Sequence, residues 1–138
     1  MSIVVDANVA VALITATPQG DAARDRLNRW RTEAEDLHAP QLFIYEVASA
    51  LCGLEAGGSL SEASSNELWS LIDALDLTLH PPSSGAALVA IARWLQRRSV
   101  YDAAYVDLAL VLKARLWTLD GKLARNAEAA GFPVTLVV

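Results

Sequence analysis

The chain has 138 residues, of which 54% are apolar and 20% are charged. This length can bury one sizeable core but is too short for two ordinary domains, so we expect a single domain spanning residues 1–138. The 11 Lys and Arg residues against 16 Asp and Glu residues give a formal net charge of −5. This charge argues against a broad phosphate-binding surface, so any contact with nucleic acid has to be local, metal-assisted or helped by a partner.

The sequence carries no sign of export or membrane insertion. Cys52 is the only cysteine, so no disulfide can form within the chain, which favours a reducing compartment. The apolar run at the N-terminus is interrupted by Asp6 and Asn8 and has no basic residues before it, unlike a signal peptide. No segment approaches the ~18 uninterrupted apolar residues of a membrane helix. We expect a soluble, cytoplasmic protein that makes no membrane contact.

Short β-type runs alternate with longer stretches of helical period along the chain. Alternation of this kind is typical of an α/β fold with a parallel sheet and helices on both faces. The predicted elements, in chain order, are strand Ile3–Val5, helices Ala7–Thr15 and Asp21–Glu35, strand Leu37–Ala39, helices Gln41–Ala56 and Ser61–Ala74, strand Leu77–Leu79, helices Ser84–Arg97 and Tyr101–Lys113, strand Leu116–Thr118, helix Gly121–Ala130 and strand Val134–Val137.

Four acids, Asp6, Glu46, Asp102 and Asp120, each lie within an apolar stretch. A carboxylate in apolar surroundings is costly unless it is paired, hydrogen-bonded or bound to a metal ion. Asp6 and Asp120 fall where a predicted strand passes into a helix, and ligands bind at such strand ends in open α/β sheets. Asp102 opens the helix before the fourth strand, so the three Asp residues can converge on one crevice. A divalent-cation site is the simplest shared explanation.

Each acid also has a purely structural explanation. Asp is a favoured N-cap worth ~1 kcal/mol, so Asp6, Asp102 and Asp120 could each serve only to start a helix. Glu46 lies several residues into its helix, beside the apolar face, and a half-exposed Glu at such a place often pairs with a nearby Arg. The pattern of four acids together favours the metal site.

The four acids and their neighbours resemble the motifs of PIN-domain ribonucleases, in particular the VapC-type toxins of toxin–antitoxin pairs. The similarity lies in four pieces that occur in the family's order and extend from the first strand to the last helix: Val5-Asp6-Ala7-Asn8, Tyr45-Glu46-Val47, Tyr101-Asp102-Ala103-Ala104-Tyr105 and Thr118-Leu119-Asp120-Gly121-Lys122-Leu123.

The resemblance implies a three-layer α/β fold with a central parallel sheet of about five strands and an acidic pocket that binds Mg²⁺ or Mn²⁺. Asp6 and Asp102 would be the principal metal ligands, with Glu46 and Asp120 completing the pocket directly or through water. Asn8 and Thr118 match polar positions beside the pocket, where they would orient the carboxylates. The implied reaction is hydrolysis of an RNA phosphodiester by an activated water, with either one or two metal ions.

Several further residues are candidates for lesser roles. Arg97, Arg98, Lys122 and Arg125 lie near the acidic motifs and could contact RNA phosphates, although Arg97 and Arg98 also suit the end of a helix. Asp107 is ~140° around its helix from Asp102, so it is not expected to share the pocket. It would make a contact at the rim or pair with a neighbouring Arg.

The resemblance also implies partners: an RNA substrate, a small cognate antitoxin that covers the acidic pocket, and assembly as a homodimer or a toxin–antitoxin hetero-oligomer. Two alternatives stay open. A phosphoryl-transfer or phosphatase-like domain also uses acidic strand ends with Mg²⁺, although Asp6-Ala7-Asn8 lacks the second Asp of a D-x-D motif. A catalytically silent binding module would use the acids only as helix caps.

Overall fold

The computed structural model describes residues 1–138 and has a five-stranded sheet at its centre. The strands lie in the order β3-β2-β1-β4-β5, and every neighbouring pair is parallel. The predicted parallel sheet is confirmed, and each predicted strand end lies within one residue of the observed one. The observed strands are β1 (Ser2–Val5), β2 (Asp36–Pro40), β3 (Thr78–His80), β4 (Arg115–Thr118) and β5 (Val134–Leu136).

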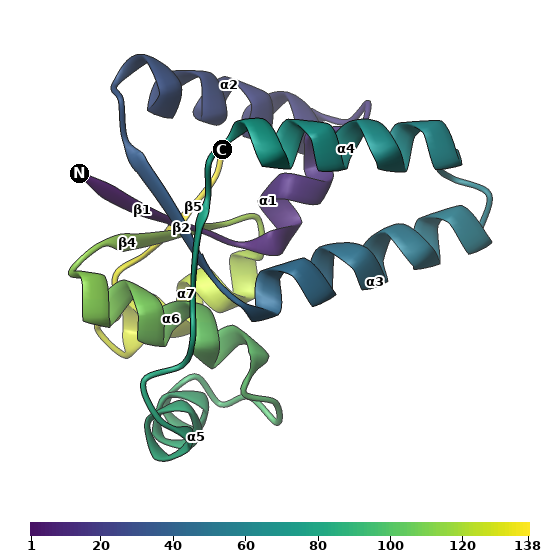
Figure 1. Ribbon diagram of the computed structural model, residues 1–138. Helices are drawn as coiled ribbons and strands as arrows, with labels where there is room; N and C mark the ends of the chain where they lie inside the picture. Colours follow the sequence, from purple (N-terminus) through teal and green to yellow (C-terminus); the bar gives the residue numbers. More distant parts are fainter.

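Helices cover both faces of the sheet, so the fold has three layers (Figure 1). Parallel strands require crossovers, and right-handed crossovers place the helices that connect β1 to β3 on one face and those that connect β3 to β5 on the other. No helix combines the length and apolar character needed to span a bilayer. The first group is α1 (Ala7–Ala12), α2 (Pro18–Thr32), α3 (Leu42–Ala56) and α4 (Glu62–Ala74); the second is α5 (Gly85–Trp94), α6 (Tyr101–Leu112) and α7 (Gly121–Ala129).

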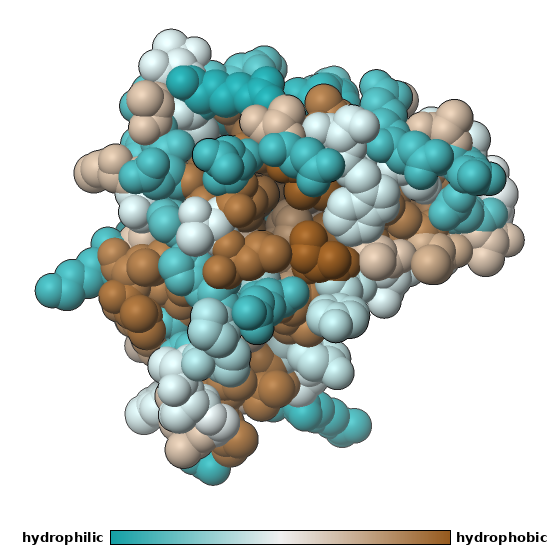
Figure 2. Space-filling model, in the orientation of Figure 1, coloured by the Kyte–Doolittle hydropathy of each residue, from teal (hydrophilic) through white to brown (hydrophobic).

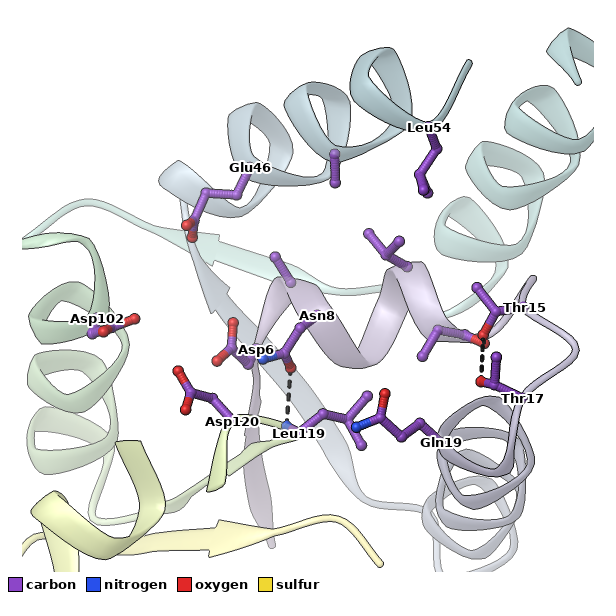
Figure 3. Close-up of a pocket in the computed structure, with 14 residues that line it drawn as sticks. Asp6, Asn8, Thr15, Thr17, Gln19, Glu46, Leu54, Asp102, Leu119 and Asp120 are labelled. Carbon is purple, nitrogen blue, oxygen red and sulfur yellow. Dashed lines mark hydrogen bonds between the residues drawn. The ribbon is translucent and has the colours of Figure 1, made fainter. Parts of the chain in front are cut away.

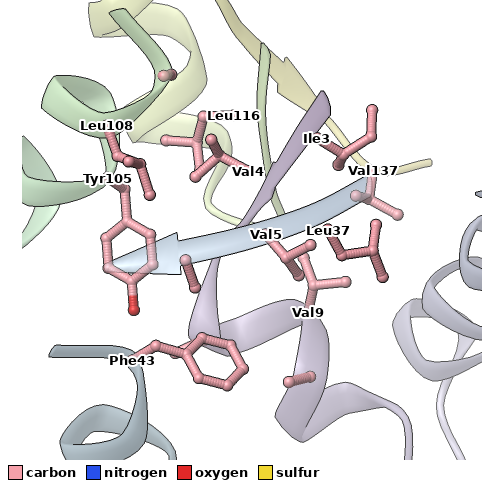
Figure 4. Packing of buried hydrophobic residues seen from close by; sticks show 14 of the residues in the cluster. Ile3, Val4, Val5, Val9, Leu37, Phe43, Tyr105, Leu108, Leu116 and Val137 are labelled. Carbon is pink, nitrogen blue, oxygen red and sulfur yellow. The ribbon is translucent and has the colours of Figure 1, made fainter. Parts of the chain in front are cut away.

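The central strand β1 is buried on both faces, as expected for a parallel sheet. Val4 packs with Leu116 and the α6 side chain Leu108, whereas Val5 lies on the opposite face with the α1 residue Val9 (Figure 4). Burial on both faces explains why β1 reads as a continuous apolar run in the sequence. It also fixes the point at which the chain leaves β1 and enters α1.

The edge strand β3 has only three residues and lies at the front of the molecule in Figure 1. Hydrophilic residues dominate the surface over α2 and α4, while apolar residues reach the surface in the middle of this face, below α4 (Figure 2). Leu79 of β3 is 38% exposed. Because the strand is so short, it offers few free backbone groups for pairing with another chain.

Helix α1 begins where predicted but ends earlier, and α2 both begins and ends earlier than predicted. Helix α1 ends at Ala12, not at Thr15, and α2 begins at Pro18, not at Asp21. The Thr17 hydroxyl caps α2 by accepting a hydrogen bond from the amide of Gly20 at 3.0 Å, and Pro18 occupies the first helical position, where it is favoured. A Cβ atom on Gly20 would collide with the carbonyl of Thr15. The two helices therefore meet in a tight corner that needs this glycine.

The strand order reverses between β1 and β4, because the chain runs outward from β1 to β3 and then crosses back to β4. Asp6 follows β1, and Asp120 lies two residues beyond the end of β4. The backbone amide of Asp6 donates to the carbonyl of Trp117 at 3.0 Å, which joins the two strand ends. In open α/β sheets the crevice at such a switch point is where ligands bind.

Candidate functional site

A pocket of ≈ 570 Å³ opens at the carboxyl ends of β1 and β4. The structure brings all four predicted acids to this pocket, as the sequence pattern predicted. Asp6, Asp102 and Asp120 lie at one end with Glu46 above them, and the other end runs between α1 and α3 towards Thr17 (Figure 3). The acidic end is therefore assembled from four separate segments of the chain: the β1–α1 junction, α3, α6 and the β4–α7 junction.

Asp6 is buried at the end of β1 and is held by its neighbours across the sheet. One of its oxygens, Oδ2, accepts a hydrogen bond from the Thr118 hydroxyl at 2.8 Å. The same hydroxyl accepts from Asn8 Nδ2 at 3.2 Å and from the Asp120 amide at 3.0 Å. Asn8 Oδ1 in turn accepts from the amide of Leu119 at 3.1 Å (Figure 3). Asn8 and Thr118 thus fix the Asp6 carboxylate and join the β1–α1 and β4–α7 junctions.

The pKa of Asp6 is raised from 3.8 to about 7, mainly by burial and also by the charges of Glu46 and Asp102, against the lowering effects of the Thr118 hydrogen bond and the Asn8 backbone. Although Asp6 stands at the N-cap position of α1, its side chain makes no capping hydrogen bond. Capping therefore does not explain why this carboxylate is buried, although the backbone of Asn8 lowers its pKa. No Lys or Arg forms an ion pair with it, so its charge is uncompensated within the chain.

Glu46 points from the second turn of α3 towards the other acids (Figure 3). Burial raises its pKa, as does the charge of Asp102, while the nearby Tyr105 hydroxyl acts in the opposite direction. Glu46 Oε1 and the Tyr105 hydroxyl are both buried without a hydrogen-bond partner. The Arg partner considered for Glu46 from the sequence is absent. Glu46 Oε1 therefore lies unsatisfied beside the buried Tyr105 hydroxyl.

Tyr105 was quoted in the sequence motif without a role, yet it is fully buried and its hydroxyl lies beside the acids. Burial is the main cause that raises its pKa, followed by the charge of Asp6 and by contact with Glu46, so it stays a neutral phenol. Tyr105 is three residues after Asp102, and residues at this spacing share a helix face. That spacing in Tyr-Asp-Ala-Ala-Tyr was the signal that could have placed it at the site.

Asp102 and Asp120 share one cation, Arg97. Arg97 Nε lies 3.2 Å from Asp102 Oδ2, and Arg97 Nη2 donates to Asp120 Oδ2 at 3.3 Å. Asp120 caps α7, since its Oδ1 accepts from the amide of Leu123 at 3.0 Å. Asp102 lies in the first turn of α6 but makes no capping bond. Asp120 therefore caps its helix while it also lines the pocket, whereas Asp102 caps no helix.

The pKa of Asp102 is raised mainly by burial and also by the charge of Asp120, and the guanidinium of Arg97 works against both effects. Three of the four acids, Asp6, Glu46 and Asp102, thus have raised pKa values in the metal-free protein. Converging carboxylates are expected to behave in this way until a cation joins them.

The donor set suits a hard divalent cation, because every group at the acidic end is an oxygen. No three His, Cys, Asp or Glu side chains lie close enough together to form a finished metal cluster. Mg²⁺ takes only one or two protein carboxylates and keeps several waters, so a loose group of acids fits this ion. The unsatisfied Glu46 Oε1 and the uncompensated charge of Asp6 support the same assignment.

The remaining candidates lie outside the acidic end. Arg98 and Lys122 are exposed, and Arg125 lines a separate depression beside α7. Asp107 does not line the acidic pocket, as predicted, but the expected rim contact or Arg partner is wrong. It is buried and accepts hydrogen bonds from the amide of Ser83 at 3.1 Å and from its hydroxyl at 2.5 Å. Asp107 therefore fastens the β3–α5 loop to α6.

The family model of the PIN domain matches residues 3–129. The chain belongs to the PIN-domain family. Ribonuclease VapC3 of Pyrobaculum aerophilum is 33% identical over 138 residues, covering 96% of this chain and 100% of that protein. Ribonuclease VapC3 of Mycobacterium tuberculosis is also 33% identical, covering 94% of this chain and 92% of that protein. These relatives confirm the resemblance to PIN-domain proteins of the VapC type.

The crystal structure of PAE2754 from Pyrobaculum aerophilum has a similar fold, with a TM-score of 0.70, 21% identity, and coverage of 91% of this chain and 79% of that one. At this identity the likeness concerns the fold alone. It agrees with the three-layer PIN architecture described above.

Proposed function

We propose that this PIN-domain protein is a ribonuclease that hydrolyses RNA phosphodiesters with Mg²⁺ or Mn²⁺ and acts as the toxin of a toxin–antitoxin pair. The relatives named Ribonuclease VapC support the ribonuclease class. The acidic pocket at the switch point of the sheet supports the metal. The observation that carries the proposal is that Asp6 and Glu46 are drawn into apolar surroundings with raised pKa values and no cationic partner.

Asp6 and Asp102 would hold the cation, and Glu46 and Asp120 would complete the pocket directly or through water. When bound, the cation would activate a water molecule for attack on phosphorus and offset charge on the phosphate oxygens. The Thr118 hydroxyl donates to Oδ2 of Asp6 and so holds this carboxylate in a fixed orientation at the pocket.

Glu46 has a further property that suits catalysis. It lies beside the Tyr105 hydroxyl, and burial raises its pKa, which makes it a stronger base than an ordinary Glu. A carboxylate with these properties can take a proton from an attacking water, as a general base does. Asp120 is less free, because one oxygen caps α7 and the other faces Arg97. We therefore assign proton transfer to Glu46 and a supporting role to Asp120.

An RNA cleavage assay tests the proposal. Wild-type protein is incubated with structured RNA and Mn²⁺ or Mg²⁺, and Asp6→Ala, Glu46→Gln and Asp102→Ala proteins are compared with it. The matched control is Asp107→Asn, which changes an acid on the same helix as Asp102 but outside the pocket. We expect cleavage to be lost in the three pocket variants and retained in the control. Metal-dependent cleavage that persists unchanged in Asp6→Ala and Asp102→Ala would refute the site.

The toxin role requires a partner that covers the pocket. The net charge of −5 and the acidic pocket favour a partner that places a basic segment over the pocket. Tyr45 of α3, 74% exposed, directly precedes Glu46 and offers that segment an apolar contact. We propose a small basic antitoxin as this partner, with the toxin itself a homodimer or part of a hetero-oligomer.

Co-expression with the neighbouring small open reading frame tests the partner. A stable complex with suppressed RNA cleavage is the expected result, and light scattering gives the stoichiometry of the free and bound protein. A strictly monomeric protein that ignores this product would contradict the toxin role while leaving the nuclease proposal intact.

A further inference from the structure

Arg97 reaches the acidic end of the pocket from a sharply turned loop. Helix α5 ends at Trp94, and Gln96 adopts a left-handed conformation with φ 57°. The amide of Arg97 then donates to the carbonyl of Ala92 at 3.0 Å, which closes the turn in the manner of a Schellman motif. Asn126 Nδ2 of α7 donates to the carbonyl of Leu95 at 3.2 Å. The loop is therefore tied to both α5 and α7, and Arg97 starts from a fixed position.

The guanidinium of Arg97 lies between two acids from different helices. Its Nε is 3.2 Å from Asp102 Oδ2, its Nη2 is 3.3 Å from Asp120 Oδ2, and its side chain is only 22% exposed. No other Lys or Arg forms an ion pair with the four pocket acids. One cation of the chain itself thus pairs with two of the four acids, and Asp6 and Glu46 are left without one.

We propose that Arg97 is an internal counter-ion that occupies a divalent cation's place beside Asp102 in the metal-free protein, so that metal binding requires it to give up this carboxylate. This inference rests on the proposed function, which assigns Asp102 to the metal. A guanidinium and a divalent cation that share one carboxylate oxygen repel each other at short range, where the partly buried site weakens solvent screening. Arg97 therefore stabilises the metal-free site and raises the cation concentration needed to fill it.

The direction in which the loss of Arg97 changes metal affinity separates this role from ordinary structural support. If Arg97 competes with the cation, removing its charge strengthens metal binding while it weakens the metal-free fold. If Arg97 only holds the two acids in place for the metal, removing it weakens both. Arg98 is the matched control, because it carries the same charge one residue along the loop, is exposed and makes no ion pair.

Mn²⁺ titration by calorimetry, without RNA, measures the coupling in wild type, Arg97→Gln, Arg97→Lys and Arg98→Gln. We expect Arg97→Gln to bind Mn²⁺ about 5-fold or more tightly than wild type, within the usual range of coupling between sites. It should also melt at a lower temperature without metal and show a larger Mn²⁺-induced rise. Arg98→Gln should match wild type in all three quantities. Arg97→Lys should bind with intermediate affinity, because an ammonium keeps the charge but lacks the planar fork that bridges both carboxylates.

An unchanged or weaker Mn²⁺ affinity in Arg97→Gln overturns the proposal while the metal site itself stands. If Arg97→Gln does not fold, Arg97→Lys decides: an affinity equal to or weaker than that of wild type overturns the proposal, and a tighter one supports it. If folded wild type and Arg97→Gln both fail to bind Mn²⁺, the metal site of the proposed function is wrong and the counter-ion role falls with it.

Discussion

Replacing Asp6 with Asn tests whether the pocket stores unfavourable charge in the metal-free protein. The change keeps the size of the side chain and an oxygen that can accept from Thr118, but it removes the charge. In the folded protein the Asp6 carboxyl keeps its proton up to about pH 7, whereas the ordinary pKa is 3.8. The folded state therefore binds more protons than the unfolded chain between these values, and stability falls as the pH rises through this window.

The magnitude follows from the pKa values. A rise from 3.8 to about 7 corresponds to roughly 4 kcal/mol of lost stability above neutral pH, of which somewhat more than half is lost between about pH 5 and pH 8. Asn does not titrate in this range, so Asp6→Asn does not lose this stability as the pH rises. Its melting temperature relative to wild type should therefore increase by roughly 8 °C between the same two pH values in a protein of this size.

Urea and thermal unfolding of both proteins, in buffers with chelator from about pH 5 to pH 8, measure this difference. Asp25→Asn is the control, because Asp25 is exposed on α2 and makes no ion pair. Adding Mn²⁺ should raise the melting temperature of wild type and have a much smaller effect on Asp6→Asn. A stability difference between Asp6→Asn and wild type that stays constant within about 1 kcal/mol across this pH range would refute the reasoning from burial.

Three further changes probe the other acids. Asp102→Asn should melt at the same or a higher temperature without metal but show a weaker Mn²⁺-induced rise; an unchanged rise would remove Asp102 from the site. Glu46→Gln should still bind Mn²⁺ in calorimetry yet lose most RNA cleavage at saturating metal, and full cleavage would exclude proton transfer by Glu46. Asp107→Ala should cost about 1–3 kcal/mol in urea unfolding without altering Mn²⁺ affinity, because it strands the amide of Ser83, whereas Ser83→Ala should cost less.

The sequence predicted the sheet well because each strand is short, apolar and bounded by polar residues or proline. The helix ends were predicted less well. Thr17 is a favourable N-cap and Pro18 a favourable first residue of α2. The helical pattern of apolar residues before them continues to Ile14, however, and this concealed where α2 begins. Helix Ser84–Arg97 was extended three residues too far, since it ends at Trp94. Hydrophobic periodicity does not show where tertiary packing ends a helix. Gln96 adopts a left-handed conformation although it is not a glycine, so no glycine marks the end of this helix in the sequence.

The site was predicted from residues whose surroundings can be inferred from their neighbours in the sequence. Asp6 and Asp120 follow apolar strands, so their positions at the sheet's edge could be inferred from the chain alone. Contacts between distant segments could not be inferred. Asp107 meets Ser83 only because the β3–α5 loop folds back onto α6, and Arg97 meets Asp120 only because α7 packs beside the α5–α6 loop. The sequence showed these charges but not their partners.

These partners give the four acids unequal roles. Asp120 is satisfied before any ligand arrives, since it caps α7 and faces Arg97. Asp6 is buried and Glu46 is half-buried, and neither has a cationic partner, so both carry unfavourable charge that a metal would relieve. Asp102 has an intermediate role, because it forms an ion pair with Arg97 and also lines the pocket. Relief of the charge on Asp6 would therefore contribute most to the binding of a cation, while Asp102 would set the concentration at which the cation displaces Arg97.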